Sequence, residues 1–143
     1  MTTPLSDEIR ALLSAPSFAH LATLVPDGSP QSAVVWIDLE GDHVLVATGE
    51  GSIKAKNTRR DPRVALSVTA LDNPYREAQL RGRVIERRPD ASLAVIDRIS
   101  RKYTGGPFPI RANPEQRVVL VIAIERARYL ALPFTPPPIS PAR

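Results

Sequence analysis

Polar and apolar residues alternate along most of this chain, and the spacing becomes helical in only a few places. Apolar residues recur at helical spacing between positions 5 and 13, and Ser6 is the candidate N-cap. The pattern predicts a short amphipathic helix that ends before Pro16. Ser52 can cap a second short helix that runs through Arg60. Pro89 can begin a longer helix that reaches about Tyr103.

The segments between these helices have the alternation typical of β-strands. Expected strands are Ala19–Val25, Pro30–Leu39, His43–Thr48, Arg63–Ala70, Glu77–Glu86 and Arg117–Ile124. The last of them is continuously apolar, so we expect it to be buried on both sides, in a barrel core and against a subunit contact. Short connections and no regular β-α-β alternation predict a mainly β, antiparallel barrel with short helices at its ends.

Proline content separates the chain into a domain and a tail. Residues 1–132 contain all of the predicted elements and are expected to form a single domain. Residues 133–143 are rich in proline, which cannot donate to a sheet, and we expect an extended or disordered C-terminal tail.

Composition limits the chemistry that the protein can perform. The 143 residues include no cysteine and 2 histidines, which excludes thiol chemistry and cysteine-ligated metals, so we expect no metal site and a borrowed cofactor for any redox reaction. No apolar stretch is long enough to span a membrane and the N-terminus lacks a signal-peptide pattern, so we expect a cytoplasmic protein that does not bind membranes. The net charge of +4 favours an anionic partner.

Basic residues are concentrated between positions 52 and 63, at the start of the second predicted helix. Lysine and arginine side chains together with free N–H groups at a helix N-terminus favour a phosphate or another anion. A solvated basic helix explains the same pattern about equally well. Nucleic acid is a weaker alternative, because aromatic residues make up only 5% of the chain and no nucleic-acid motif is present.

Four stretches of the sequence resemble one family. Ile53–Leu66 is similar to the K-x-[KR]-N-x-x-R-[DN]-P-R-[VA] signature of the pyridoxamine 5'-phosphate oxidase-like (PNPOx-like) split barrels, which include FMN-binding proteins. Three further stretches resemble the branch that depends on the deazaflavin coenzyme F420. They read AHLATLVPDGSPQ from Ala19, NPYREAQLRGRV from Asn73 and DRISRKYTGGPFP from Asp97.

The resemblance implies a homodimeric split β-barrel that holds its cofactor between subunits. The phosphate-binding lysine of the family matches Lys54, and the cofactor-binding residues that the resemblance implies are Gln31, Ser32, Ala33, Val34, Trp36, Thr48, Ser52, Lys54, Lys56, Asn57 and Arg76. Tyr75, Arg76 and the stretch 102–111 are expected to close the pocket from the other subunit. A proton must also reach the product, either from solvent or from a pocket hydroxyl, and Tyr75 and Tyr103 are the candidate catalytic residues for that second role.

The resemblance also implies a function, which is oxidoreduction with coenzyme F420. The reduced deazaflavin would transfer a hydride to an unsaturated or electrophilic small molecule. Coenzyme F420 is a long anion with a phosphodiester and carboxylates, which suits a basic protein. Two alternatives remain: an FMN-dependent oxidase or reductase of the same fold, and a non-catalytic protein that binds F420 or a haem-type ligand.

Overall fold

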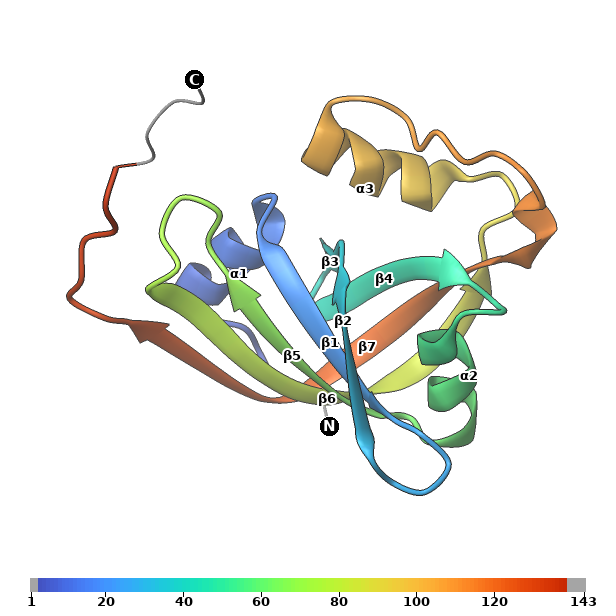
Figure 1. Ribbon diagram of the computed structural model, residues 1–143, viewed down its shortest axis with the longest axis horizontal. Helices are drawn as coiled ribbons and strands as arrows, with labels where there is room; N and C mark the ends of the chain where they lie inside the picture. The colour runs from blue at the N-terminus through green and yellow to red at the C-terminus, as the bar shows by residue number, and fades with distance from the viewer. Residues whose placement is uncertain (1–2, 139–143) are drawn as a thin grey trace.

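The computed structural model describes residues 3–138, which form one antiparallel sheet and three α-helices (Figure 1). The helices are α1 (Asp7–Ser14), α2 (Ile53–Arg60) and α3 (Ala94–Thr104), and a 3-10 turn, η1, spans Pro114–Gln116. The strands are β1 (Phe18–Leu24), β2 (Pro30–Val35), β3 (Asp38–Glu40), β4 (His43–Gly49), β5 (Arg63–Thr69), β6 (Arg76–Pro89) and β7 (Arg117–Ala131).

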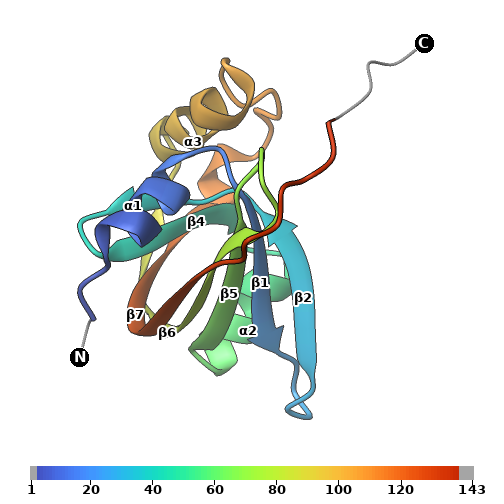
Figure 2. The same cartoon turned by 90° about the vertical axis from the view of Figure 1, so that its left-hand side faces the viewer.

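The seven strands lie in the order β2-β1-β5-β6-β7-β4-β3, and each neighbouring pair is antiparallel. The two edge strands, β2 and β3, are consecutive in the chain and only Trp36 and Ile37 separate them. Since two residues cannot cross an open sheet of this width, the sheet must curve until its edges meet. The result is the expected split barrel, which Figure 2 shows with β1, β2 and β5 on one side and β4 on the other.

The core of the barrel contains the inward-facing side chains of every long strand. Fully buried residues include Leu21, Leu80, Leu120, Ile122 and Ile124. The other face of β7 is buried as well, because Val119 and Val121 pack with Leu45 of β4 and Val95 of α3. Burial of β7 on both sides was predicted correctly, and in this chain α3 provides the outer contact.

The barrel closes at Ile37, where the backbone bonds to α3 instead of to a neighbouring strand. The Tyr103 hydroxyl accepts a hydrogen bond from the N–H of Ile37 at 3.2 Å, and Lys102 Nζ donates to the Ile37 carbonyl. The Lys102 ammonium also donates to the carbonyl of Leu13 at the end of α1. Two side chains of α3 therefore satisfy the buried polar groups at the break between β2 and β3.

Most predicted boundaries are correct within a few residues, and four predicted elements differ for clear reasons. The strand predicted from Pro30 to Leu39 is two strands, since the chain passes between sheet edges at Trp36 and Ile37. β6 and β7 are longer than predicted because they pair with each other beyond the segments that β5 and β4 cover. The helix predicted from Pro89 begins at Ala94, where Leu93 has a left-handed conformation and the Asp90 carboxylate accepts hydrogen bonds from the N–H groups of Val95 and Ile96.

The predicted tail has no regular structure where it is described. β7 ends at Ala131, and residues 132–138 run away from the barrel as an extended segment in which Phe134 packs edge-on against Tyr75. Positions 139–143 of the predicted tail lie outside the described residues. No helix within residues 3–138 has the length and apolar character needed to cross a membrane.

Gly82 lies where β6 comes close to the backbone of β7. A Cβ atom at this position would lie 2.0 Å from the carbonyl oxygen of Ala123, a backbone atom that cannot move without separating the strands. Two register shifts flank this point, between Arg81 and Gly82 and between Val84 and Glu86. Bulges of this kind bend a strand, so Gly82 lies where the pair bends around the barrel.

We therefore expect Gly82→Ala to lower the free energy of unfolding by at least about 2 kcal/mol, as overpacking does in a dense core. Gly106→Ala is the matched control, because nothing lies within 4 Å of a Cβ at Gly106 and its φ is not positive. Urea denaturation of both variants measures the difference. Equal stability of the two variants would contradict the close approach.

Candidate functional site

The N-terminus of α2 is fixed by two hydroxyl groups that the resemblance had assigned to the cofactor. Ser52 Oγ accepts a hydrogen bond from the N–H of Ala55 at 3.2 Å, as expected for an N-cap. Thr48 Oγ1 donates to Ser52 Oγ at 3.0 Å. These contacts connect the end of β4 to the start of α2 and so fix the position of Lys54, the second residue of the helix.

A cavity of about 280 Å³ lies between β2, β4, the start of α2 and α3. It brings together four of the predicted cofactor residues: Val34, Trp36, Thr48 and Lys54. The remaining lining residues are Val35, Ala47, Ile96, Phe108 and Arg117. Its walls are mostly apolar, with two basic side chains, which is the usual composition of a site for a small organic anion.

The two basic side chains of the cavity have no acidic partner. Neither Lys54 nor Arg117 forms an ion pair with any residue in the range 3–138, and the buried Arg117 Nε has no hydrogen-bond acceptor. Burial lowers the pKa of the Lys54 ammonium, and the positive charge of Arg117 lowers it further. Burial also lowers the pKa of Arg117, although Asp90 opposes this effect. A bound anion would relieve both the repulsion and the unsatisfied donor.

Two aromatic side chains, Trp36 and Phe108, line the same cavity as Lys54. Trp36 stacks on Tyr103 with ring centroids 5.2 Å apart and an interplanar angle of 9°, and its other contact is the edge of Phe108 at 6.3 Å. The Arg117 guanidinium lies over the Phe108 ring at 5.1 Å. The cavity therefore combines flat apolar surfaces with positive charge, an arrangement suited to a planar molecule that carries a phosphate or carboxylate.

Asp97 holds Phe108 in this position. Its carboxylate accepts hydrogen bonds from the N–H of Phe108 at 3.0 Å and from Arg111 at 2.7 Å. The bond to Arg111 is the main reason why the pKa of Asp97 lies below its usual value. The side-chain hydrogen bonds of Asp97 therefore connect α3 to the loop that follows it.

Phe108 and Arg117 were not singled out from the sequence as cofactor-binding residues. Phe108 belongs to the stretch that was expected to reach the pocket from another subunit, and it also lines the cavity of its own chain. Arg117 appeared only as the first residue of an apolar strand, and its contact with the cavity depends on a pairing of Arg117 with Gly49 that no local pattern indicates.

Other predicted residues lie outside the cavity. Alternation along β2 separates Ser32 and Val34, on the outer face, from Gln31 and Ala33, on the opposite face. Lys56 is exposed on α2. Asn57 is buried, where its amide donates to Thr23 Oγ1 at 3.0 Å and accepts from Arg60, so it attaches α2 to β1.

The two candidate proton donors are not among the residues that line the cavity. Tyr103 accepts from the N–H of Ile37 and donates its own proton to the Ser17 carbonyl at 2.8 Å, and burial raises the pKa of its phenol. Tyr75 packs on Phe134 near the end of β7, and its neighbour Arg76 donates to the Tyr129 hydroxyl at 3.1 Å. Within residues 3–138, no cluster of three or more histidine, aspartate and glutamate side chains could hold a metal ion.

The fold and the cavity together define a class of protein, an antiparallel split barrel with a positively charged, aromatic-walled cavity on its outer side. A family model described as pyridoxamine 5'-phosphate oxidase matches residues 5–131. The chain belongs to this family, and the resemblance drawn from the four sequence stretches is confirmed.

Solved structures agree with this assignment. One structure, described as an F420 reductase, is 32% identical with a TM-score of 0.77, over 83% of this chain and 94% of that chain. A conserved hypothetical protein from Mycobacterium tuberculosis is 27% identical with a TM-score of 0.73, over 97% and 95% of the two chains. General Stress Protein 26 from Bacillus anthracis is 20% identical with a TM-score of 0.66, over 87% and 92%, and shows the fold alone. No curated protein sequence matches the chain.

The contacts of Tyr103 predict a structural effect of removing its hydroxyl. Tyr103→Phe leaves the N–H of Ile37 and the carbonyl of Ser17 without their partner, and we expect a loss of about 1–3 kcal/mol in the free energy of unfolding. Tyr75→Phe is the control, since the Tyr75 hydroxyl forms no hydrogen bond within the described part of the chain. Thermal or urea unfolding would refute this role if both variants were as stable as the parent protein.

Proposed function

We propose that this protein is an oxidoreductase that uses coenzyme F420 and reduces an unsaturated or electrophilic small molecule. The observation that carries the proposal is the pair of unpartnered cations, Lys54 and Arg117, beside the aromatic side chains of Trp36 and Phe108. The similarity to an F420 reductase supports the choice of cofactor. When bound, the reduced deazaflavin supplies a hydride to the substrate, and the protein supplies the alignment.

The residues of the cavity fit the phosphate end of such a cofactor. Lys54 and Arg117 would bind the phosphate with charge-assisted hydrogen bonds, and Trp36 and Phe108 would exclude water and contact the ring. A volume of about 280 Å³ lies below the range of cavities that enclose a whole cofactor. We therefore propose that the rest of the cofactor lies over β2, covered by a second copy of the chain in a homodimer.

Neither candidate tyrosine lines the cavity of its own chain. The hydroxyl proton of Tyr103 is already donated to the Ser17 carbonyl, and Tyr75 packs against the extended C-terminal segment. We propose that the proton comes from solvent. The protein then contributes binding, orientation and partial exclusion of water.

FMN is the second candidate cofactor, because its single phosphate also suits Lys54 and Arg117. Side-by-side titration with F420 and FMN, followed by the fluorescence of Trp36, the only tryptophan, separates the two. We expect tighter binding of F420, and the same samples should sediment at twice the mass of the chain. Preference for FMN would overturn the choice of cofactor, and F420 binding without reduction of any quinone or enone would favour a non-catalytic binding protein.

In the same titration, Lys54→Ala should weaken F420 binding by about 1.5–3 kcal/mol, the contribution of one hydrogen bond to a charged group. Arg101→Ala is the matched control, since Arg101 is an exposed cation without an ion-pair partner and does not line the cavity. Unchanged affinity of the Lys54 variant would contradict its assignment to the phosphate.

The pKa of Lys54 predicts how this affinity changes with pH. Burial and Arg117 lower the pKa of the free protein's Lys54 below its usual value of 10.5, and a bound phosphate raises it again. The affinity should therefore be highest at pH values where Lys54 is charged in the free protein, and should decrease with rising pH before 10.5 is reached. Lys54→Arg should remove this decrease, because arginine stays charged. If the affinity of Lys54→Arg still decreased with rising pH, the decrease would be caused by another group.

A further inference from the structure

Cations without partners are concentrated in two places. Among residues 3–138, the lysine and arginine side chains that form neither an ion pair nor a hydrogen bond are Lys54, Lys56, Arg81, Arg101, Arg117, Arg126 and Arg128. Lys54 and Arg117 lie in the cavity described above. Arg81, Arg126 and Arg128 form a second group, the arginine cluster, on the outer face of β6 and β7.

The strand register brings the arginine cluster together. Arg81 of β6 lies directly opposite Arg126 of β7, and Arg128 lies opposite Gln79, the next outward-facing residue of β6. Like charges on directly opposite positions destabilise a sheet. Since no carboxylate within the described residues pairs with them, this arrangement carries a cost in the protein alone.

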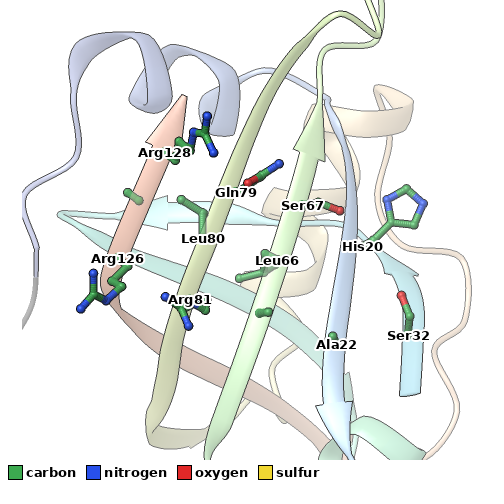
Figure 3. Close-up of a pocket in the computed structure, with 12 residues that line it drawn as sticks. His20, Ala22, Ser32, Leu66, Ser67, Gln79, Leu80, Arg81, Arg126 and Arg128 are labelled. Atoms are coloured by element: carbon green, nitrogen blue, oxygen red, sulfur yellow. The ribbon is translucent and has the colours of Figure 1, made fainter. Parts of the chain in front are cut away.

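The arginine cluster borders a groove of about 650 Å³ on the outer face of the sheet. Figure 3 shows Arg126 and Arg128 on β7 and Arg81 on β6 at one side of the groove, with His20 of β1 and Ser32 of β2 at the other. Small side chains line the part between them: Ala22, Ala65 and Ser67. The groove has the size of a ligand site, with positive charge at only one end.

Two carboxylates of β6 and β7 that lie close to the arginine cluster in the sequence have partners within the chain. Glu77 accepts a hydrogen bond from Gln79 at 3.4 Å, and Glu125 pairs with Arg83 at 3.4 Å. A symmetric dimer that packed on this face would present the same residues from both sides. If such a dimer buried the arginines, they would need a bound anion even more, because an unpaired charge is costly when it is buried.

The end of the groove at Ser32 lies beside the cavity that contains Lys54 and Arg117. Ser32 lines the groove, Val34 lines the cavity, and both project from the outer face of β2. Three to four strand spacings, about 14–19 Å, separate β2 from β6 and β7. An elongated molecule can therefore reach the cavity with one end while its acidic end contacts the arginine cluster.

We propose that Arg81, Arg126 and Arg128 bind the carboxylate or phosphate end of an elongated anionic substrate, whose electrophilic part lies at β2 beside the cavity. This assignment rests on the proposed function for the placement of the reduced cofactor. In this assignment, specificity is determined by the acidic end of the substrate. That end lies at a distance from the carbon that reacts.

Two probes that differ at a single carboxyl group, charged in one and esterified in the other, test the proposal. They are a naphthoquinone bearing a long-chain carboxylic acid and the methyl ester of the same molecule. Quenching of Trp36 fluorescence reports arrival of the quinone at the cavity, without cofactor and without turnover. We expect the acid to bind about tenfold more tightly than the ester, as for one charge-assisted hydrogen bond, and this difference to shrink in high salt.

Arg126→Gln and Arg128→Gln should each remove most of the difference between acid and ester, while the matched control Arg101→Gln should keep it. The Arg126 variant should unfold at an equal or higher temperature, because repulsion from Arg81 is relieved. Equal binding of acid and ester to the parent protein, or an unchanged difference in the arginine variants, would overturn the proposal.

Titration of the same variants with F420 distinguishes this proposal from the proposed function. Normal F420 binding without a difference between the probes means that only the substrate assignment is wrong. A probe difference that depends on Arg126, in a protein that does not bind F420, supports the anion site and refutes the cofactor assignment. Weaker F420 binding in the Arg126 variant, with the probes unaffected, would assign the arginine cluster to the cofactor's acidic tail and overturn the substrate assignment.

Discussion

The hydrogen bonds at Ile37 are the interaction on which the rest of this structure depends. At this residue the chain leaves one edge of the sheet and joins the other, and its N–H and carbonyl groups would be buried without strand partners. Tyr103 and Lys102 supply the missing partners from α3. The same contacts place Tyr103 under Trp36, so the closure of the barrel and the aromatic wall of the cavity have a common origin.

Charge is distributed unevenly over this frame. Eight of the 15 arginines within residues 3–138 form ion pairs on the surface, and such pairs contribute little to stability. The unpaired cations are different, because Lys54 with Arg117, and Arg81 with Arg126, are held close together by fixed backbone elements. The repulsion within each pair destabilises the protein alone, and a bound anion would relieve it. The net positive charge of the chain is thus related to anion binding at two neighbouring surfaces.

Local patterns in the sequence predicted the features that depend on local physics. Ser52 was recognised as a cap because capping needs only neighbouring residues, and β5 was recognised from its alternation. Lys54 was found by resemblance to a family motif. The division at Trp36, the contribution of Arg117 to the cavity and the opposition of Arg81 and Arg126 all depend on strand register between distant segments. No pattern within a short window contains that information.

The late position of β7 in the chain has a consequence for biosynthesis. This strand is the neighbour of both β4 and β6, and it is made after each of them and after α3. Until it is made, two strands with apolar inner faces lack their common partner, although the local hairpins β1–β2, β3–β4 and β5–β6 can already form. The barrel is thus exposed to aggregation for most of its synthesis, and a chaperone that binds extended apolar segments would act in that interval.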